Sequence, residues 1–348
     1  MTDPKRVYHL ALRELHAAAG ATFGIHDGWS LPEHYGNAAA EHAALRSGAV
    51  LMDRSHFSRF LVTGTDAGVV LHAAFAGHVD ELEEGRAMRS VALNGSGEIT
   101  DVVLIARTGG IAYLVVGEPG QRFTTLARLQ EQVKADFDVR IDDRTESTCL
   151  MGLAGPAAEE IAHRHLAEGL PARLQTLQSV SFEFHGFRAL ATRTSGVGED
   201  GFEFMLAPAV AQHIIETLRA EGVNLAGRVA QESARVESCI PAYAPDLETG
   251  LSPAEADLDV LLDVAGGRER WMLSALVVEG DEPLPAGTPI RIDGERAGEL
   301  RSCVRSFALR LTIGLAVIES RRAIPGRTLD LDGIRATIVA KPFYRRRS

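Results

Sequence analysis

The sequence predicts an α+β protein that ends in a separate all-β domain, and three observations favour this fold class. Segments with helical periodicity alternate irregularly with short apolar runs that are typical of strands. A pattern of hairpin, strand and helix occurs twice, which favours paired, ferredoxin-like α+β units. After about residue 275 the chain consists of short strands punctuated by Pro and Gly, without a long helix, as in β-barrels and sandwiches.

The hydrophobic periodicity and the turn residues predict the first set of helices and strands. Residues 7–20 (VYHLALRELHAAAG) are expected to form a helix that begins after Pro4. The segments that follow are a helix at 37–48, a strand at 56–64, a helix at 66–77, a hairpin at 86–107 around a Gly-Ser-Gly turn, a strand at 111–120 and a helix at 121–137.

The second round repeats this pattern loosely, and the β-rich segment follows it. We expect a strand at 147–155, a helix at 156–169, a hairpin at 180–194, a strand at 202–208 and a helix at 209–222. Residues 262–272 (LDVAGGRERWM) are expected to connect the two parts. The predicted domains are therefore an α+β region at 1–270, which the family resemblance described below divides into two intertwined domains, and an all-β barrel or sandwich at 275–348.

Composition and charge exclude several classes of function. The 36 Lys and Arg against 47 Asp and Glu give a net charge of −11, which argues against a nucleic-acid partner. No apolar run approaches the roughly 18 residues of a membrane span, and the N-terminus lacks a signal-peptide core. The three cysteines are far apart, and the histidines lack metal-ligand spacing, so we expect a cytoplasmic protein with neither disulfide nor metal site.

Asp101 is the first candidate site residue, because it stands directly before the apolar run Val102 to Ile105 in LNGSGEITDVVLI, residues 93–105. One interpretation makes it the last polar residue of the turn. The other makes it an acid or base aimed into a pocket.

Glu199 and Arg235 also have two interpretations each. In ATRTSGVGEDGFEFML (191–206), Glu199 is expected at the tip or in a bulge of a hairpin; the alternative is a simple turn in which Asp200-Gly201 supplies the left-handed residue. Arg235 recurs at helical spacing with Gln231 and Ser238, ahead of a Tyr- and Pro-containing loop. Its guanidinium could hold a ligand, or form a surface ion pair with a neighbour such as Glu232.

Taken together, these segments resemble the aminomethyltransferase (glycine cleavage T-protein) family of tetrahydrofolate-dependent one-carbon enzymes. The similarity preserves the order of motifs from about residue 9 to residue 344. The segments that carry it are residues 26–67, LNGSGEITDVVLI, RTSGVGEDGFEF (193–204), ARVES (234–238), LSPAEADL (251–258) and AKPFYR (340–345).

The resemblance implies a T-protein-like ring of three domains around a folate channel, with discontinuous α+β domains and a C-terminal β-barrel. It implies that Asp101 is the catalytic and folate-contacting acid, that Glu199 hydrogen-bonds the pterin edge, and that Arg235 and Tyr243 line the pocket. Carboxylates suit these roles, since they accept paired N–H donors and can orient or deprotonate an amine. The implied partners are a small-molecule one-carbon donor and, as a further candidate, a lipoyl carrier protein.

The sequence departs from the family pattern at several folate contacts. Arg89 stands in place of an aromatic residue, Gly117 in place of Asn, Gly196 in place of Tyr, and Gln231 in place of Arg. The resemblance implies a tetrahydrofolate-dependent transferase of an aminomethyl or methyl group from a small donor. Because of these departures, the alternative is a repurposed member of the family, either a specialised O-, N- or S-demethylase or a non-catalytic folate-binding protein.

Overall fold

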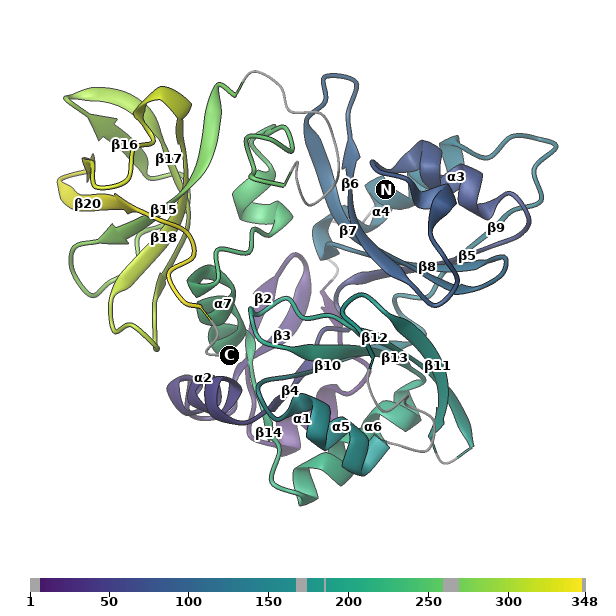
Figure 1. Cartoon of the computed structure of the whole chain (residues 1–348). Coiled ribbons are helices and arrows are strands. Elements are labelled where there is room, and N and C mark those ends of the chain that lie inside the picture. The colour runs from purple at the N-terminus through teal and green to yellow at the C-terminus, as the bar shows by residue number, and fades with distance from the viewer. Residues whose placement is uncertain (1–6, 167–173, 185, 259–268, 346–348) are drawn as a thin grey trace. The chain divides into compact units, whose positions relative to one another are not determined.

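The computed structural model describes residues 7–166, 174–184, 186–258 and 269–345, and Figure 1 traces the chain. The chain divides into two compact units. Unit 1 comprises residues up to 90, 103–195 and 199–230, and unit 2 comprises 91–102, 196–198 and the chain from 231 onward. The domain boundaries at 270 and 275 stay a prediction, and most of the expected connection at 262–272 lies outside the described residues.

The larger sheet of unit 1 has six strands in the order β11-β12-β13-β10-β4-β14. Their bounds are β11 Ser179–Phe184, β12 Phe187–Arg193, β13 Gly201–Leu206, β10 Cys149–Ala154, β4 Val50–Asp53 and β14 Asn224–Leu225. Neighbouring strands are antiparallel except for β14 and β4. The predicted hairpin at 180–194 is confirmed as β11 and β12.

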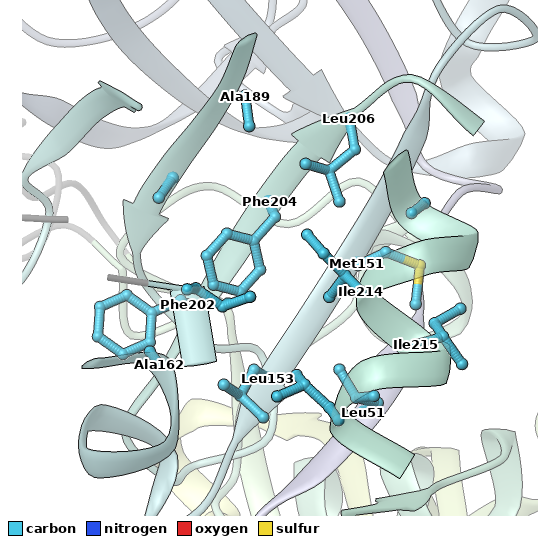
Figure 2. Close-up of a cluster of buried hydrophobic side chains, with 14 of the residues drawn as sticks. Leu51, Met151, Leu153, Ala162, Ala189, Phe202, Phe204, Leu206, Ile214 and Ile215 are labelled. Carbon is cyan, nitrogen blue, oxygen red and sulfur yellow. The ribbon is translucent and has the colours of Figure 1, made fainter. Parts of the chain in front are cut away.

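One face of this sheet packs against α5 (Ala158–Leu166) and α6 (Pro208–Ala220). Figure 2 shows the cluster, in which sheet side chains such as Met151 and Phe204 meet Ile214 and Ile215 of α6. These four side chains are fully buried. Burying each stabilises the fold by roughly 1.5–3 kcal/mol, so this core fixes the strands that flank the 194–200 loop.

The second sheet has five strands in the order β6-β7-β8-β5-β9. Their bounds are β6 Ala87–Leu93, β7 Ile99–Gly109, β8 Ala112–Gly117, β5 Ser58–Thr63 and β9 Arg140–Asp143. The helices α3 (Ala67–Ala74) and α4 (Arg122–Glu131) pack against each other and against strands of this sheet. The predicted hairpin at 86–107 is confirmed as β6 and β7, whose connected ends (91–102) belong to unit 2.

The N-terminal segment differs from its prediction. Instead of one helix over 7–20, α1 covers only Arg13–Ala18, and Tyr8–His9 form the strand β1. This strand pairs in parallel with β3 (Trp29–His34), which also pairs with β2 (Thr22–His26). The Tyr8 ring stacks on Trp29 with 5.1 Å between centroids, so tertiary pairing overrides the helical period. The helix predicted at 37–48 is α2 (Ala38–Ser47).

Unit 2 contains most of α7 (Arg228–Glu237), a π-helical turn at Tyr243–Leu247, and a closed barrel. The barrel order is β15-β18-β17-β16-β19-β20, drawn in yellow-green in Figure 1. The strands are β15 Trp271–Val278, β16 Pro289–Ile292, β17 Glu295–Arg305, β18 Thr312–Glu319, β19 Thr328–Leu331 and β20 Ile334–Val339. Short 3-10 turns lie at Val79–Glu81, Pro119–Gln121 and Ser320–Arg322. The α+β class with a C-terminal barrel is thus confirmed.

Candidate active site

Asp101 is a buried carboxylate inside a strand. It is the third residue of β7 and only 1% exposed, and its Oδ1 accepts a hydrogen bond of 2.8 Å from the Val102 amide. The turn before β7 is held instead by Asn94, whose Oδ1 accepts from the amides of Ser96 and Glu98 at 2.9 and 3.0 Å. The interpretation of Asp101 as the last polar residue of the turn is therefore wrong.

Tyr243 lies close enough to Asp101 for their charges to interact, and both belong to unit 2. Burial raises the pKa of the Tyr243 phenol, and the negative charges of Asp101 and Glu248 raise it further. The phenol is consequently protonated at neutral pH and able to donate a hydrogen bond. Unit 2 thus brings together a carboxylate and a hydroxyl donor.

Arg235, on α7, forms a bidentate pair with Glu232 and an ion pair with Asp246. Its Nε and Nη2 lie 3.0 and 2.6 Å from the two Glu232 oxygens, and Nη1 lies 2.6 Å from Asp246 Oδ2. The predicted pairing with Glu232 is confirmed, but the expectation of a surface pair is wrong, since Arg235 is only 8% exposed. Asp246 belongs to the same π-helical turn as Tyr243, so Arg235 anchors that turn.

Two further contacts complete the environment of Arg235. Nη1 donates to the Ile240 carbonyl at 2.5 Å, and Nη2 donates to Ser302 Oγ at 2.8 Å. Ser302 follows a bulge in β17, where the register shifts between Leu300 and Ser302. The guanidinium thereby uses all five of its N–H donors inside the protein. The prediction that Arg235 lines the folate pocket stays a prediction, and any contact with a ligand would have to displace one of these bonds.

Glu199 belongs to unit 1 and lies in the loop between β12 and β13, as expected for a hairpin tip. The left-handed residue of this loop is Gly198, with φ of +75°, and not Gly201 as the turn interpretation expects. The Glu199 side chain is buried, and its Oε1 accepts a 2.8 Å hydrogen bond from Arg46 Nη1. Oε2 is also buried, and no donor among the described residues reaches it. Glu199 therefore presents one buried acceptor oxygen that its own chain leaves unsatisfied.

The sequence did not point to Arg46 and Asp246. Arg46 is the partner of Glu199, and Asp246 is a partner of Arg235. Arg46 sits in the last turn of α2, and nothing in its neighbourhood distinguishes it from a surface residue. Asp246 stands between two candidate segments, and its one signal is the sequence Tyr243-Ala-Pro-Asp, where a carboxylate follows a turn-forming Pro.

Two features of the described residues bear on other classes of function. No group of three His, Cys, Asp or Glu side chains in the described part of the chain is arranged to hold a metal ion. No helix there is long and apolar enough to cross a membrane.

Comparison with known proteins matches nearly the whole chain to one family. Residues 12–265 match the model of the GCVT N-terminal domain, and residues 272–345 match that of the glycine cleavage T-protein C-terminal barrel domain. Aminomethyltransferases from Rubrobacter xylanophilus and Streptomyces avermitilis are 33% and 30% identical over 97% of this chain, which is 94% and 98% of their own lengths.

A solved structure agrees with these matches at the level of the fold. The crystal structure of glycine cleavage system aminomethyltransferase T from Bartonella henselae superposes with a TM-score of 0.90. It covers 98% of this chain and 99% of that one, at 23% identity. The resemblance inferred from the sequence is confirmed.

Proposed function

Because this chain belongs to the glycine cleavage T-protein family of aminomethyltransferases, enzymes that use tetrahydrofolate, we propose that it transfers an aminomethyl or methyl group from a small donor to tetrahydrofolate. The observation that carries the proposal is the Glu199 carboxylate, with one oxygen held by Arg46 and the other buried without a donor in the described part of the chain. An unsatisfied buried acceptor costs about 1–3 kcal/mol, and more when it is charged. Such an oxygen is expected to receive its hydrogen bond from a ligand.

Glu199 fits the cofactor that the family uses. A pterin presents neighbouring N–H donors along one edge, and a fixed carboxylate oxygen is a strong acceptor for them. Arg46 holds the carboxylate in one orientation, so the acceptor is positioned before the ligand arrives. When bound, tetrahydrofolate supplies the nitrogen atoms that accept a one-carbon group.

Asp101 is the residue to which we assign proton transfer. Its burial removes it from water, and the hydrogen bond from the Val102 amide fixes its orientation. A carboxylate held in this way can orient an attacking amine and take up its proton. Tyr243, whose phenol interacts electrostatically with Asp101, would donate a hydrogen bond to the ligand.

Arg235 acts as a positioning residue in this proposal. Its five donors are engaged with Glu232, Asp246, Ser302 and Ile240, and through Asp246 it holds the turn that carries Tyr243. Arg235 would therefore affect ligand binding by holding Tyr243 in position in the pocket wall.

A direct assay identifies the one-carbon donor. The purified enzyme is supplied with tetrahydrofolate and either an aminomethyl-loaded lipoyl carrier protein or N-methylglycine, and one-carbon-substituted tetrahydrofolate is measured by mass spectrometry. Product with the carrier protein alone identifies an aminomethyltransferase that needs this partner; product with N-methylglycine identifies a methyl-group donor. The cytoplasm is the compartment that we propose for this reaction.

Asp101→Asn is the matched variant for this assay. Removing a general acid or base lowers the rate by about 10²–10⁴-fold, whereas tetrahydrofolate binding through Glu199 persists. A folded Asp101→Asn enzyme that turns over at the wild-type rate would contradict the role of Asp101. No product from either donor would contradict the transferase activity.

A further inference from the structure

Arg89 is a partly buried guanidinium with uncharged partners. It lies on β6 within unit 1, and its Nη2 donates to Thr194 Oγ1 at 3.0 Å and to the Ser195 carbonyl at 3.2 Å. In the described part of the chain, no carboxylate forms an ion pair with it. Two of its five N–H groups are thus used, which leaves one on Nε and two on Nη1.

The neighbouring charges do not neutralise the positive charge of Arg89. The carboxylate that acts on it electrostatically is Glu203, and this group is already paired, because Arg54 Nε lies 3.0 Å from Glu203 Oε1. The Arg54 guanidinium also lies over the Phe57 ring, 4.1 Å from its centroid. The two guanidinium groups and one carboxylate therefore leave one positive charge in excess.

This excess charge is energetically unfavourable in the protein alone. Burial lowers the pKa of Arg89 below its ordinary value; the Glu203 charge opposes that shift and the Arg54 charge adds to it. A cation withdrawn from water without an anion is destabilising, and an anion that joins it removes that penalty. Arg89 keeps part of its surface in solvent, so a solute has access to this side chain.

We propose that Arg89 binds the carboxylate of a ligand in the one-carbon reaction, and that this residue determines which ligand the enzyme accepts. The planar guanidinium matches a carboxylate through two parallel N–H···O bonds, which neither a hydroxyl nor a neutral amine can form. The T-protein pattern has an aromatic residue at the position of Arg89. The positive charge therefore distinguishes this chain from the pattern, and we assign to it a role in ligand specificity.

This inference rests on the proposed function, and that function offers two carboxylates. One is the glutamate tail of tetrahydrofolate, and the other is the carboxylate of an amino-acid donor such as N-methylglycine. The probe 6-methyltetrahydropterin has the pterin ring without any carboxylate. Comparing the three compounds therefore separates recognition of the pterin from recognition of each carboxylate.

The experiment measures binding of the three compounds by calorimetry and by the rise in the thermal unfolding midpoint, for wild type and Arg89→Met. We expect the variant to bind at least one carboxylate compound about tenfold more weakly or worse, while 6-methyltetrahydropterin binds equally to both proteins. Loss for tetrahydrofolate assigns the glutamate tail; loss for N-methylglycine assigns the donor. The matched control is Arg140→Met, an arginine on β9 of the same sheet with a side chain 75% exposed, which should change neither.

A second measurement needs no ligand. Since Arg89 lacks an anion, the ligand-free Arg89→Met protein is expected to be as stable as wild type or more so. Equal binding of both carboxylate compounds by wild type and Arg89→Met, or strong destabilisation of the ligand-free variant, would overturn the proposal. Wild type that binds neither tetrahydrofolate nor 6-methyltetrahydropterin would refute the proposed function. Arg89-dependent binding of N-methylglycine would still support the carboxylate site.

Discussion

Arg46 and Glu199 form a buried ion pair, with 2.8 Å between Arg46 Nη1 and Glu199 Oε1. The two residues are 153 positions apart, and their side chains are only 9% and 0% exposed. The pair joins the last turn of α2 to the loop between β12 and β13. It therefore fixes the orientation of the one carboxylate that we assign to the pterin.

Replacement of Arg46 by Met tests this pair. The change leaves a buried carboxylate without its cation, which is expected to lower the free energy of unfolding by about 3–5 kcal/mol. Urea denaturation measures the loss. The double variant Arg46→Met/Glu199→Met, which removes both charges, should recover much of it. A single variant within about 1 kcal/mol of wild type would mean that the pair contributes no more than an exposed one.

Arg235→Lys tests the anchoring of the Tyr243 turn. Lysine keeps the charge but has three donors on one nitrogen, so it cannot hold Glu232, Asp246 and Ser302 together. Breaking buried charged hydrogen bonds is expected to lower the free energy of unfolding by about 3 kcal/mol or more. Chemical denaturation checks this, with Arg140→Lys as the exposed control. Wild-type stability in Arg235→Lys would refute the anchoring role.

Gly198→Ala tests the loop that precedes Glu199. Gly198 has φ of +75°, and a Cβ placed there would lie 1.8 Å from Ser238 Oγ and 2.5 Å from Ser238 Cβ. The left-handed backbone alone costs about 1–2 kcal/mol for a residue with a side chain, and the clash adds to it. The control is Gly95→Ala, since a Cβ at Gly95 meets nothing within 4 Å. Thermal unfolding should show a lower midpoint for Gly198→Ala only, and equal midpoints would contradict this account of the loop.

His56 gives the stability of the protein a dependence on pH. Burial and, to a smaller extent, the Arg54 charge lower its pKa to about 3, although the Asp53 charge opposes the shift. The folded state therefore keeps His56 neutral where the unfolded chain, with a pKa near 6.5, binds a proton. Stability from this group is present above pH 6.5 and is lost as the pH falls toward 3.

Between pH 7 and pH 5 this loss amounts to about 2 kcal/mol for His56 alone. Urea denaturation at both pH values, for wild type and His56→Asn, isolates it, because the amide does not titrate. Wild type should lose about 2 kcal/mol more than the variant over this interval. The same loss in both proteins would show that His56 does not carry the effect.

The sequence predicted the fold best where local rules decide the structure. The hairpin β6–β7 follows from alternation around the turn that Asn94 holds, and the all-β character of the C-terminal domain follows from its short strands between Pro and Gly. Residues 7–9 were predicted as helix because the strand there depends on a parallel partner at Trp29 and Ser30, which local periodicity does not reveal.

For the candidate site, the sequence names candidate residues but does not show their surroundings. The motifs named Asp101, Glu199, Arg235 and Tyr243, and their assigned roles remain proposals. What the sequence could not give is which atoms are already engaged: Arg235 has no donor to spare, while Glu199 Oε2 has no donor among the described residues. These properties depend on Arg46 and Asp246, whose places are set by the packing of distant segments.

The most direct test of the central claim is a calorimetric titration of wild type and Glu199→Gln with tetrahydrofolate. Glutamine keeps the size of the side chain but lacks the charge that strengthens its hydrogen bonds. We predict that wild type binds and that folded Glu199→Gln binds about 10- to 100-fold more weakly, as expected for loss of a charged hydrogen bond. Equal affinity in the two proteins, or no binding by wild type at millimolar tetrahydrofolate, would contradict the claim that Glu199 anchors the pterin.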